Sequence, residues 1–436
     1  MGTSQPSKES KEERIQRLLR KYEEALRENL TEGPQTLEEI ERETGKIGKQ
    51  VQKDLQEEKL NQSGTGYTQD RIACSCGGRA AYTADYRRQL LTLYGSVTLS
   101  RAYYYCRACK TGWCPLDARL GLDKDETSLG MRGLIGRLSA YLPDRTATRE
   151  AQLLTGVKIA PSTAQRISRG MGERIALECK QEEERLRTQG LPGPVGRVSG
   201  LHASMDGVFV FVDKKWTEVK LGVAYHLGED GVEQAAYYAT LAKSADFGRL
   251  WRTLVYKMGS GKCARFVVVA DGAEWIWQEV GKYAPTSVQI LDFYHAVEHL
   301  WGVARTRFGE GSEGAKTWMR LQKERLLDDK VGEVLADIAS WVVATPAAEQ
   351  MRESTLNYLR RHQHRMLYKT FRQWGYHIGS GVVEAGCKAT VQGRMKGAGM
   401  RWSSKGAEAM LHLRATWCTS QQTDFVAIAR RAAMAA

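Results

Sequence analysis

The chain has 436 residues, 42% of them hydrophobic, and a formal net charge of +13. This length predicts two to four structural units, and no stretch approaches the ~20 uninterrupted apolar residues of a membrane span. We therefore expect no membrane partner. The charge favours a polyanionic partner, and nucleic acid is the first candidate. Because the charged N-terminal stretch lacks an apolar signal region, we expect a cytoplasmic, nucleoid-associated protein. Nine cysteines then favour metal ligation or reduced thiols over disulfides.

The N-terminal region, residues 1–62, is predicted to be a helical arm. Apolar residues recur at helical spacing through residues 8–31, and Gly33-Pro34 interrupts them. Thr36 and Glu39 have the spacing of a capping box, which indicates the start of a second helix. A solvated helical hairpin and a self-association arm both fit this pattern. We favour packing or dimerisation and expect a homodimer.

Residues 70–125 are predicted to form a zinc-ribbon-like β-hairpin, because pairs of cysteines flank a segment rich in strand-forming residues. Two thiol pairs brought together by a hairpin are the ligand set of a structural zinc site with no open coordination position. The first pair is spaced more tightly than the usual C-x-x-C, and Cys114 could replace one ligand. The expected ligands of one Zn²⁺ are Cys74, Cys76, Cys106 and Cys109.

Residues 126–190 are predicted to be helical and to contain a candidate helix-turn-helix. Gly156 would end the first helix, and Ser162 would cap the second. An ordinary helix pair separated by a glycine fits this pattern equally well. If the motif binds DNA, its second helix would present Thr163, Gln165, Arg166 and Arg169.

After a Gly- and Pro-rich linker at residues 189–196, three strands joined by tight turns predict an antiparallel meander. Asp206 interrupts the first of these apolar strands. A charged residue in such a strand is costly unless it is paired or binds a metal ion, so Asp206 is a candidate ligand.

Two more carboxylates follow apolar strands further along the chain. Asp271 ends the run Phe266–Ala270, and Asp292 ends the run Val288–Leu291, three residues before His295. Open α/β sheets bind ligands at the carboxyl ends of their strands. For either aspartate alone, however, capping the following helix is the ordinary role.

Residues 301–375 are predicted to form an all-α insertion. The window from Arg360 to Lys405 is rich in Lys and Arg and contains a single acidic residue, Glu384, on the first turn of a predicted helix. Glu384 could be an ion-pair partner or a third metal ligand. The basic window suits a phosphate backbone. Its expected DNA contacts are Lys388, Arg394, Lys396 and Arg401.

The order Asp206, Asp271 and Glu384 resembles the DDE triad of transposases that have a ribonuclease H-like catalytic core. Asp292-Phe-Tyr-His295 is similar to the D/C-x-x-H motif of Mutator-like members, which also carry an α-helical insertion before the Glu. The segments MDG, ADGAEWIW, LDFYHAVEHLW and SGVVEAGCK together look most like bacterial insertion-sequence transposases of the Kra type. The likeness covers about residues 70–420.

This resemblance implies an α/β ribonuclease H-like core formed by residues 197–300 and 376–436. It also implies that Asp206, Asp271 and Glu384 bind two Mg²⁺ ions, with Mn²⁺ as an alternative, and that Asp292 and His295 lie beside the site without being indispensable ligands. The implied reaction is cleavage at the terminal inverted repeats of the element and transfer of the 3′ ends to target DNA. A ribonuclease H-like nuclease without strand transfer and a domesticated DNA-binding protein remain alternatives.

Overall fold

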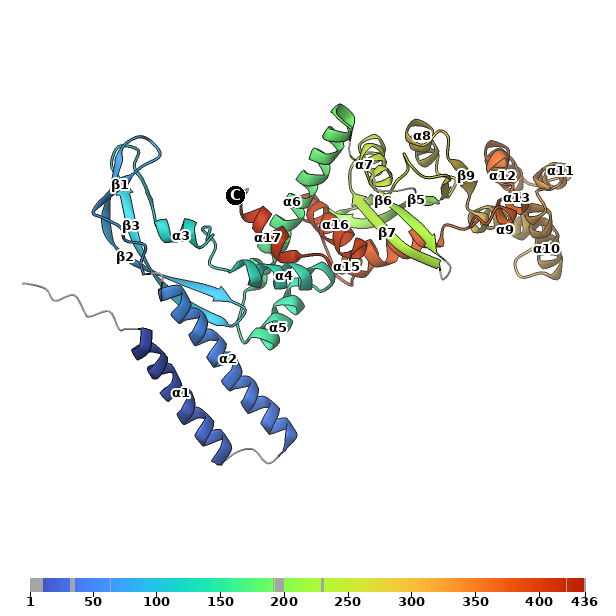
Figure 1. The fold of residues 1–436 in the computed structure, drawn as a ribbon. Coiled ribbons are helices and arrows are strands. Elements are labelled where there is room, and N and C mark those ends of the chain that lie inside the picture. The colour runs from blue at the N-terminus through green and yellow to red at the C-terminus, as the bar shows by residue number, and fades with distance from the viewer. Residues whose placement is uncertain are drawn as a thin grey trace, which may run out of the picture. The chain divides into compact units, whose positions relative to one another are not determined.

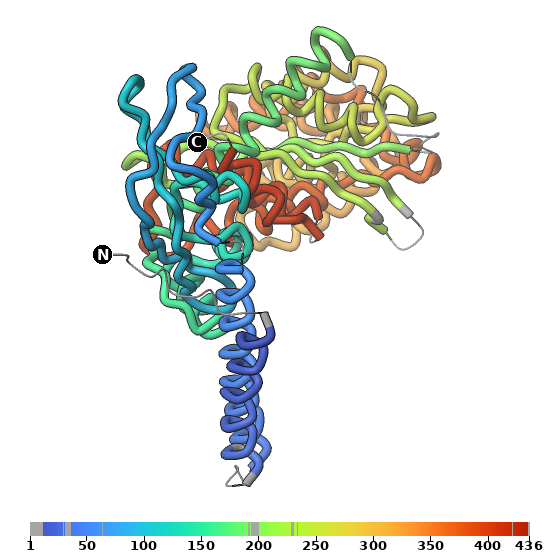
Figure 2. The backbone as a smooth tube through the Cα atoms, turned by 60° about the vertical axis from the view of Figure 1, so that its left-hand side comes forward, coloured from blue at the N-terminus to red at the C-terminus, as the bar shows by residue number. Residues whose placement is uncertain are grey.

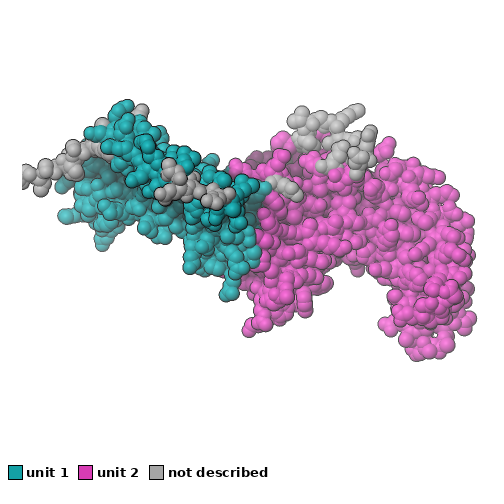
Figure 3. Space-filling model, turned by 90° about the horizontal axis from the view of Figure 1, so that it is seen from below, with its two compact units in different colours: residues 1–138, 144–164, 425–436 teal, residues 139–143, 165–424 magenta. Residues whose placement is uncertain are grey.

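The computed structural model describes residues 11–31, 36–62, 64–190, 192, 200–228, 231–420 and 422–434. The predicted linker at residues 189–196 lies mostly outside them. The chain divides into two compact units, coloured in Figure 3: unit 1 comprises residues 1–138, 144–164 and 425–436, and unit 2 comprises residues 139–143 and 165–424. Among the described residues, no helix has the length and apolar character needed to cross a membrane.

The N-terminal arm of unit 1 is a helical hairpin of α1 (Lys11–Thr31) and α2 (Leu37–Gln62), which run side by side in Figure 2. The predicted capping box is confirmed: the backbone N–H of Glu39 donates to the Thr36 hydroxyl, and that of Thr36 donates to the Glu39 carboxylate. Ion pairs such as Arg14–Glu58 connect the two helices. No described residue of α2 is fully buried, so the arm has little core of its own.

The rest of unit 1 contains a four-stranded antiparallel sheet in the order β1-β2-β3-β4. Its long hairpin, β2 and β3, is the predicted one, and α2 packs along β3. The strands and the short helix after them are β1 (Arg71–Ala73), β2 (Arg79–Thr92), β3 (Gly95–Cys106), β4 (Thr111–Trp113) and α3 (Pro115–Arg119).

Three helices follow: α4 (Leu129–Tyr141), α5 (Asp144–Thr155) and α6 (Pro161–Thr188). Gly156 ends α5 as predicted and has a φ of 76°, a left-handed conformation that glycine adopts without strain. The prediction that Ser162 caps the next helix is wrong. Helix α6 begins at Pro161, because proline has no N–H to leave unpaired at the first helical position, and Ser162 therefore lies inside the first turn.

Unit 2 is built on a five-stranded mixed sheet in the order β7-β6-β5-β8-β9. The predicted meander forms its antiparallel half, and β8 and β9 extend it in parallel with β5. The protein is therefore a mixed α/β protein, as expected. The strands are β5 (Leu201–Val212), β6 (Lys215–Gly228), β7 (Gly231–Thr240), β8 (Phe266–Ala270) and β9 (Val288–Leu291).

Helices cover both faces of this sheet (Figure 1). Gly222 of β6 lies against Trp251 of α7 (Ser244–Lys257), so closely that a Cβ would approach that ring within 2.7 Å. The preceding residue, Leu221, lies near Gly386 at the end of α14 (Gly381–Gly386). Because successive strand residues point to opposite faces, α7 and α14 lie on opposite faces. Leu221 pairs with Asp206 across the strands, so Asp206 faces α14.

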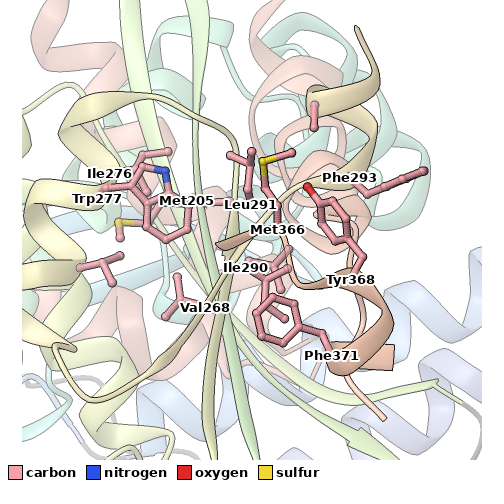
Figure 4. Close-up of a cluster of buried hydrophobic side chains, with 14 of the residues drawn as sticks. Met205, Val268, Ile276, Trp277, Ile290, Leu291, Phe293, Met366, Tyr368 and Phe371 are labelled. Carbon is pink, nitrogen blue, oxygen red and sulfur yellow. The ribbon is translucent and has the colours of Figure 1, made fainter. Parts of the chain in front are cut away.

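Residues 301–375 are helical, as predicted, although α9 continues through the expected boundary at residue 301. This region shares its core with the sheet. Figure 4 shows Met366, Tyr368 and Phe371 beside Ile290 and Leu291 of β9 in one buried cluster. The helices of this part of the chain are α8 (Glu274–Tyr283), α9 (Phe293–Phe308), α10 (Glu313–Leu327), α11 (Val331–Ser340), α12 (Pro346–His362) and α13 (Tyr368–Gln373).

After α14 the helix widens into a π-helical segment, Cys387–Gln392, and continues as α15 (Gly393–Met395); α16 (Ser404–Thr419) follows. The last helix, α17 (Phe425–Ala433), belongs to unit 1, so the expected core segment 376–436 does not form a single unit. The reason is that α17 packs against α4: Val426 contacts Gly133, where a Cβ would lie 2.7 Å from the valine side chain.

His202 of β5 should make the protein sensitive to acid. Its side chain is buried and stacks on Tyr225, and burial lowers the pKa of His202 to about 4, with the nearby His377 and His226 adding to the effect. Between these two pKa values, His202 is therefore protonated in the unfolded chain and neutral in the folded chain. As the pH falls from about 6.5 to about 4, the free energy of unfolding should decrease by about 3 kcal/mol more in wild type than in His202→Phe. The free energy of unfolding is measured with urea at each pH. An equal change with pH in wild type and in the variant would contradict the prediction.

Candidate functional site

The carboxylates singled out in the sequence lie on neighbouring strands of unit 2. The register of parallel β5 and β8 pairs Ala203 with Val268, and continuing it places Asp206 beside Asp271. Strands β8 and β9 end together, with Ala270 opposite Leu291, so Asp271 and Asp292 follow them at equivalent positions. The N–H of Asp292 donates to the Ala270 carbonyl at 2.8 Å, which extends the pairing by one residue.

Asp206 is half-buried, and its partners come from its own strand and from the segment after α14. Its Oδ1 accepts a hydrogen bond from the Gly207 N–H at 2.6 Å, and the Cys387 thiol donates to Oδ2 at 3.3 Å. Burial raises the pKa of Asp206 above its usual range despite these bonds, and the negative charge of Glu384 contributes to the rise. The ionised carboxylate is therefore held in surroundings that disfavour its charge.

Asp271 is also half-buried and is fixed by local contacts. Its Oδ1 accepts from the Ala273 N–H at 2.9 Å, and its carbonyl accepts from the Trp277 indole at 2.7 Å. Burial raises the pKa of Asp271, and the charges of Asp206 and Asp292 raise it further. Asp271 thus lies close enough to Asp206 and to Asp292 for their charges to disfavour its ionised form.

Gly272 allows an unusually close approach beside Asp271. A Cβ on this residue would lie 2.1 Å from the ring of Tyr358, which belongs to α12 in the helical insertion. That ring also stacks on His299 at a centroid separation of 3.7 Å. The insertion therefore contributes an aromatic wall to the loop that carries Asp271.

Asp292 is fully buried and connects two segments that are far apart in the sequence. As the N-cap of α9, its Oδ1 accepts from the His295 N–H at 2.8 Å, and its Oδ2 accepts from the Ser380 N–H. The N–H of Phe293 donates to the Ile378 carbonyl at 2.9 Å, next to that contact. Burial alone would raise the pKa of Asp292, but the hydrogen bonds from His295 and Ser380 lower it to about 2. Asp292 is therefore ionised and holds the start of α14 against α9.

His295 extends from the first turn of α9 and is partly exposed. Its Nδ1 lies 3.4 Å from Oδ1 of Asp292, the distance of an ion pair. The interaction with Asp292 raises the pKa of His295 to about 9, against the opposing effect of burial. In the absence of a bound cation, the imidazolium partly offsets the surrounding negative charge.

Glu384 belongs to the same cluster and comes from a different helix, α14. The candidate ligand atoms of Asp292, His295 and Glu384 all lie within 4.8 Å of one another. Helix α14 reaches this position because Gly386 has no side chain: a Cβ there would lie 2.7 Å from the Tyr237 ring of β7. The structure thus brings all five residues that the sequence singled out into one region, in which Glu384 lies near both the Asp292–His295 pair and Asp206.

Four of the five cysteines of unit 1, namely Cys74, Cys76, Cys106 and Cys109, form a second cluster that can hold a metal ion such as zinc. Their Sγ atoms all lie within 4.8 Å of one another; Cys74 is 3.6 Å from Cys109, and Cys76 is 3.8 Å from Cys106. One pair lies in the turn between β1 and β2, and the other comes from the end of β3 and the turn after it. Cys114 is buried at the start of α3 and is not part of the cluster.

The predicted DNA contacts differ in exposure. In α6, Gln165, Arg166 and Arg169 are exposed and Thr163 is half-buried; in the basic window, Lys388, Lys396 and Arg401 are exposed. Arg394 is only 3% exposed. It donates to the Ser139 carbonyl at 3.0 Å, and its guanidinium lies over the Trp402 ring. Arg394 is therefore a packing residue of unit 2 and not a surface contact for DNA.

Three residues near the cluster were not singled out as functional from the sequence: Cys387, Tyr358 and Gly386. Each acts through a contact with a residue distant in the chain, and no local pattern marks it. A comparison with protein-family models finds no match for this chain. The chain also matches none of the curated proteins with which it was compared.

Proposed function

We propose that the protein is a DNA transposase of the DDE type with a ribonuclease H-like core. The observation that carries the proposal is the convergence of Asp206, Asp271 and Glu384, from a mid-strand position, a strand end and a helix, around one half-buried region. The sheet supports it, since three antiparallel strands followed by two parallel ones are the order expected for that core.

The donor set fits hard divalent cations such as Mg²⁺ or Mn²⁺, because carboxylate oxygens are their preferred ligands. Burial raises the pKa values of Asp206 and Asp271, and neighbouring carboxylates raise them further: Glu384 acts on Asp206, and Asp206 and Asp292 act on Asp271; a cation would relieve both effects. When bound, two such ions supply the charge that activates a water or a 3′-hydroxyl and stabilises an in-line phosphoryl transfer. The chain's carboxylates would hold them, while nearby basic side chains position the DNA backbone.

The decisive experiment incubates the protein with Mg²⁺ and duplexes made from the DNA flanking its own gene. A transposase is expected to cut the element ends and to join the freed 3′ ends to a second DNA. Cutting without joining would support the ribonuclease H-like nuclease instead. Binding with neither reaction, in both Mg²⁺ and Mn²⁺, would support a DNA-binding protein without chemistry.

DNA binding is expected to weaken steeply with salt, because each neutralised phosphate releases counterions. Lys388, Lys396 and Arg401 are exposed and make no salt bridge within the described part of the chain. Affinity for end-containing duplexes should fall about 10³-fold between roughly 50 and 200 mM salt. Each change of Lys388, Lys396 or Arg401 to Gln should reduce the slope of log K against log salt by about 1.

The matched control is Lys316→Gln, which removes an exposed lysine that already pairs with Glu313. Its slope should equal that of wild type. A flat salt dependence of the wild-type protein, measured by fluorescence anisotropy, would show that this basic surface is not the DNA contact.

The proposed homodimer would form through the arm. Apolar side chains remain exposed on both helices of this hairpin, and two copies could bury them as a four-helix bundle. We expect Leu19→Glu combined with Leu26→Glu to convert a dimer into a monomer in light scattering, whereas Glu23→Lys, on an exposed charged position, should not. A wild-type monomer would contradict the proposal. The exposed apolar residues are Ile15, Leu19, Leu26, Leu30, Leu37, Ile40 and Leu55.

A further inference from the structure

The candidate metal ligands in unit 2 separate into two groups. Asp206 lies in β5 and Asp271 follows the neighbouring strand β8, whereas the ligand atoms of Asp292, His295 and Glu384 form a set within 4.8 Å of one another. Neither Asp206 nor Asp271 belongs to that set. Glu384, expected as the third member of a carboxylate triad, is therefore grouped with an imidazole and a different aspartate.

We infer that Asp292, His295 and Glu384 form a metal-binding site of their own, which takes a divalent transition-metal ion through two carboxylates and one imidazole. The inference deepens the proposed function, because one of the two catalytic ions would occupy this site. The metal binding itself does not depend on that function and can be measured without any DNA.

The arrangement of Asp292 is compatible with a ligand role. Its two oxygens accept one backbone N–H each, from His295 and Ser380, and the side chains of the same two residues are its other partners. A carboxylate has about four lone-pair sites, so a cation would take the site that faces the His295 ring while the remaining hydrogen bonds hold the ligand in place. Asp292 is thus oriented before a cation arrives.

His295 gives the site its selectivity. An aspartate at a helix N-cap would need no histidine for its structural role, yet a ligand atom of the imidazole lies within 4.8 Å of those of both Asp292 and Glu384. Nitrogen ligands bind Mn²⁺ and the later first-row ions better than they bind Mg²⁺. We therefore expect this site to bind Mn²⁺ more tightly than Mg²⁺, whereas the Asp206–Asp271 pair offers only oxygen.

The experiment uses Mn²⁺ as the probe on the full-length protein. Mn²⁺ is paramagnetic, and its preference for oxygen and nitrogen ligands disfavours binding to the four clustered thiols of unit 1. Pulsed electron paramagnetic resonance detects coupling to a directly bound imidazole nitrogen, and titration calorimetry counts the bound ions. Wild type should show the nitrogen coupling.

Two variants assign the signal. His295→Gln should lose the coupling and weaken one class of Mn²⁺ site by at least ~10–100-fold, the effect of disturbing even an outer-shell partner. His299→Gln is the matched control. This imidazole lies one helical turn further along α9, stacked on Tyr358 and outside the ligand set, so its loss should leave the coupling unchanged.

Absence of nitrogen coupling in wild type overturns the inference, and so does coupling that survives His295→Gln. The wild-type measurement needs no variant to fold. If the coupling behaves as expected but the protein never joins DNA strands, the site stands and the transposase proposal fails. If strands are joined with Mg²⁺ while Mn²⁺ shows no coupling, the transposase proposal stands and this site fails.

Discussion

Asp206→Asn, Asp271→Asn and Glu384→Gln are each expected to abolish end cleavage and strand transfer. Each change removes a ligand charge while keeping the shape of the side chain. Because bound cations would supply both the activated nucleophile and the charge stabilisation, the loss should reach roughly 10³-fold or more in rate. DNA binding should be retained or become tighter, since one negative charge near the phosphates is lost. The measurement is a gel assay of cleavage and joining with Mg²⁺.

In the absence of metal, the two aspartate variants should be more stable than the wild-type protein. Because the folded-state pKa values of Asp206 and Asp271 are raised, their ionised forms destabilise the folded protein at neutral pH, and acid removes that penalty. Asp206→Asn and Asp271→Asn should therefore melt at a higher temperature than wild type without metal and gain less from added Mg²⁺.

Asp246→Asn is the control for both measurements. This aspartate lies on α7, on the sheet face opposite α14, and pairs with Arg249 on the surface. Its activity should stay near that of wild type. A triad variant that still joins strands at a wild-type rate would remove that residue from the active site. If that residue were Glu384, the proposal that α14 contributes a ligand to the active site would be wrong.

Cys106→Ser should release a bound metal ion and unfold the cysteine end of the unit 1 sheet. The buried cluster at this end is small: beside its thiols it contains two alanines and one tyrosine, with Ile72, Tyr82 and Trp113 partly buried against it, so it has too little apolar surface to fold alone. A structural zinc ion would contribute its binding free energy directly to folding. We expect metal analysis to find about one zinc per chain in wild type and none in the variant.

Hydrogen exchange should locate the effect of Cys106→Ser. Amides of β1, β4 and the adjoining ends of β2 and β3 should lose protection, while the sheet of unit 2 keeps its protection. Cys114→Ser is the matched control, because Cys114 is also buried but lies outside the four-thiol cluster. Wild-type protein free of tightly bound metal, or an unchanged exchange pattern in the Cys106 variant, would contradict the zinc assignment.

Local patterns predicted most elements of this fold. The unbroken apolar run before Asp271 is strand β8, and the Thr36–Glu39 spacing is a capping box, because both depend only on nearby residues. Arg394 illustrates what such patterns miss. A basic residue in a basic window is expected to be an exposed phosphate contact. Arg394 instead donates to Ser139, which lies 255 positions earlier in the chain.

The candidate site likewise combines features that local sequence patterns predict with features that they miss. Asp292 and His295 could be placed beside the other carboxylates from the order of the strands, and the N-cap role of Asp292 follows from its position before a helix. Its contact with Ser380, 88 residues away, depends on how the insertion returns the chain to the sheet. No spacing in the sequence encodes that return, so the grouping of Glu384 with Asp292 and His295 could not be predicted.

The π-helical segment after Glu384 limits how this region can vary in length. A π-helical turn contains one residue more than an α-helical turn, and such turns occur often at functional sites. Because this turn already absorbs one extra residue, deleting one residue between Cys387 and Gln392 would allow a regular α-helix and keep Glu384 close to its present orientation relative to α15. A further inserted residue that the helix could not absorb would rotate Glu384 by about 100° relative to α15. A one-codon insertion here should therefore be more harmful than a one-codon deletion.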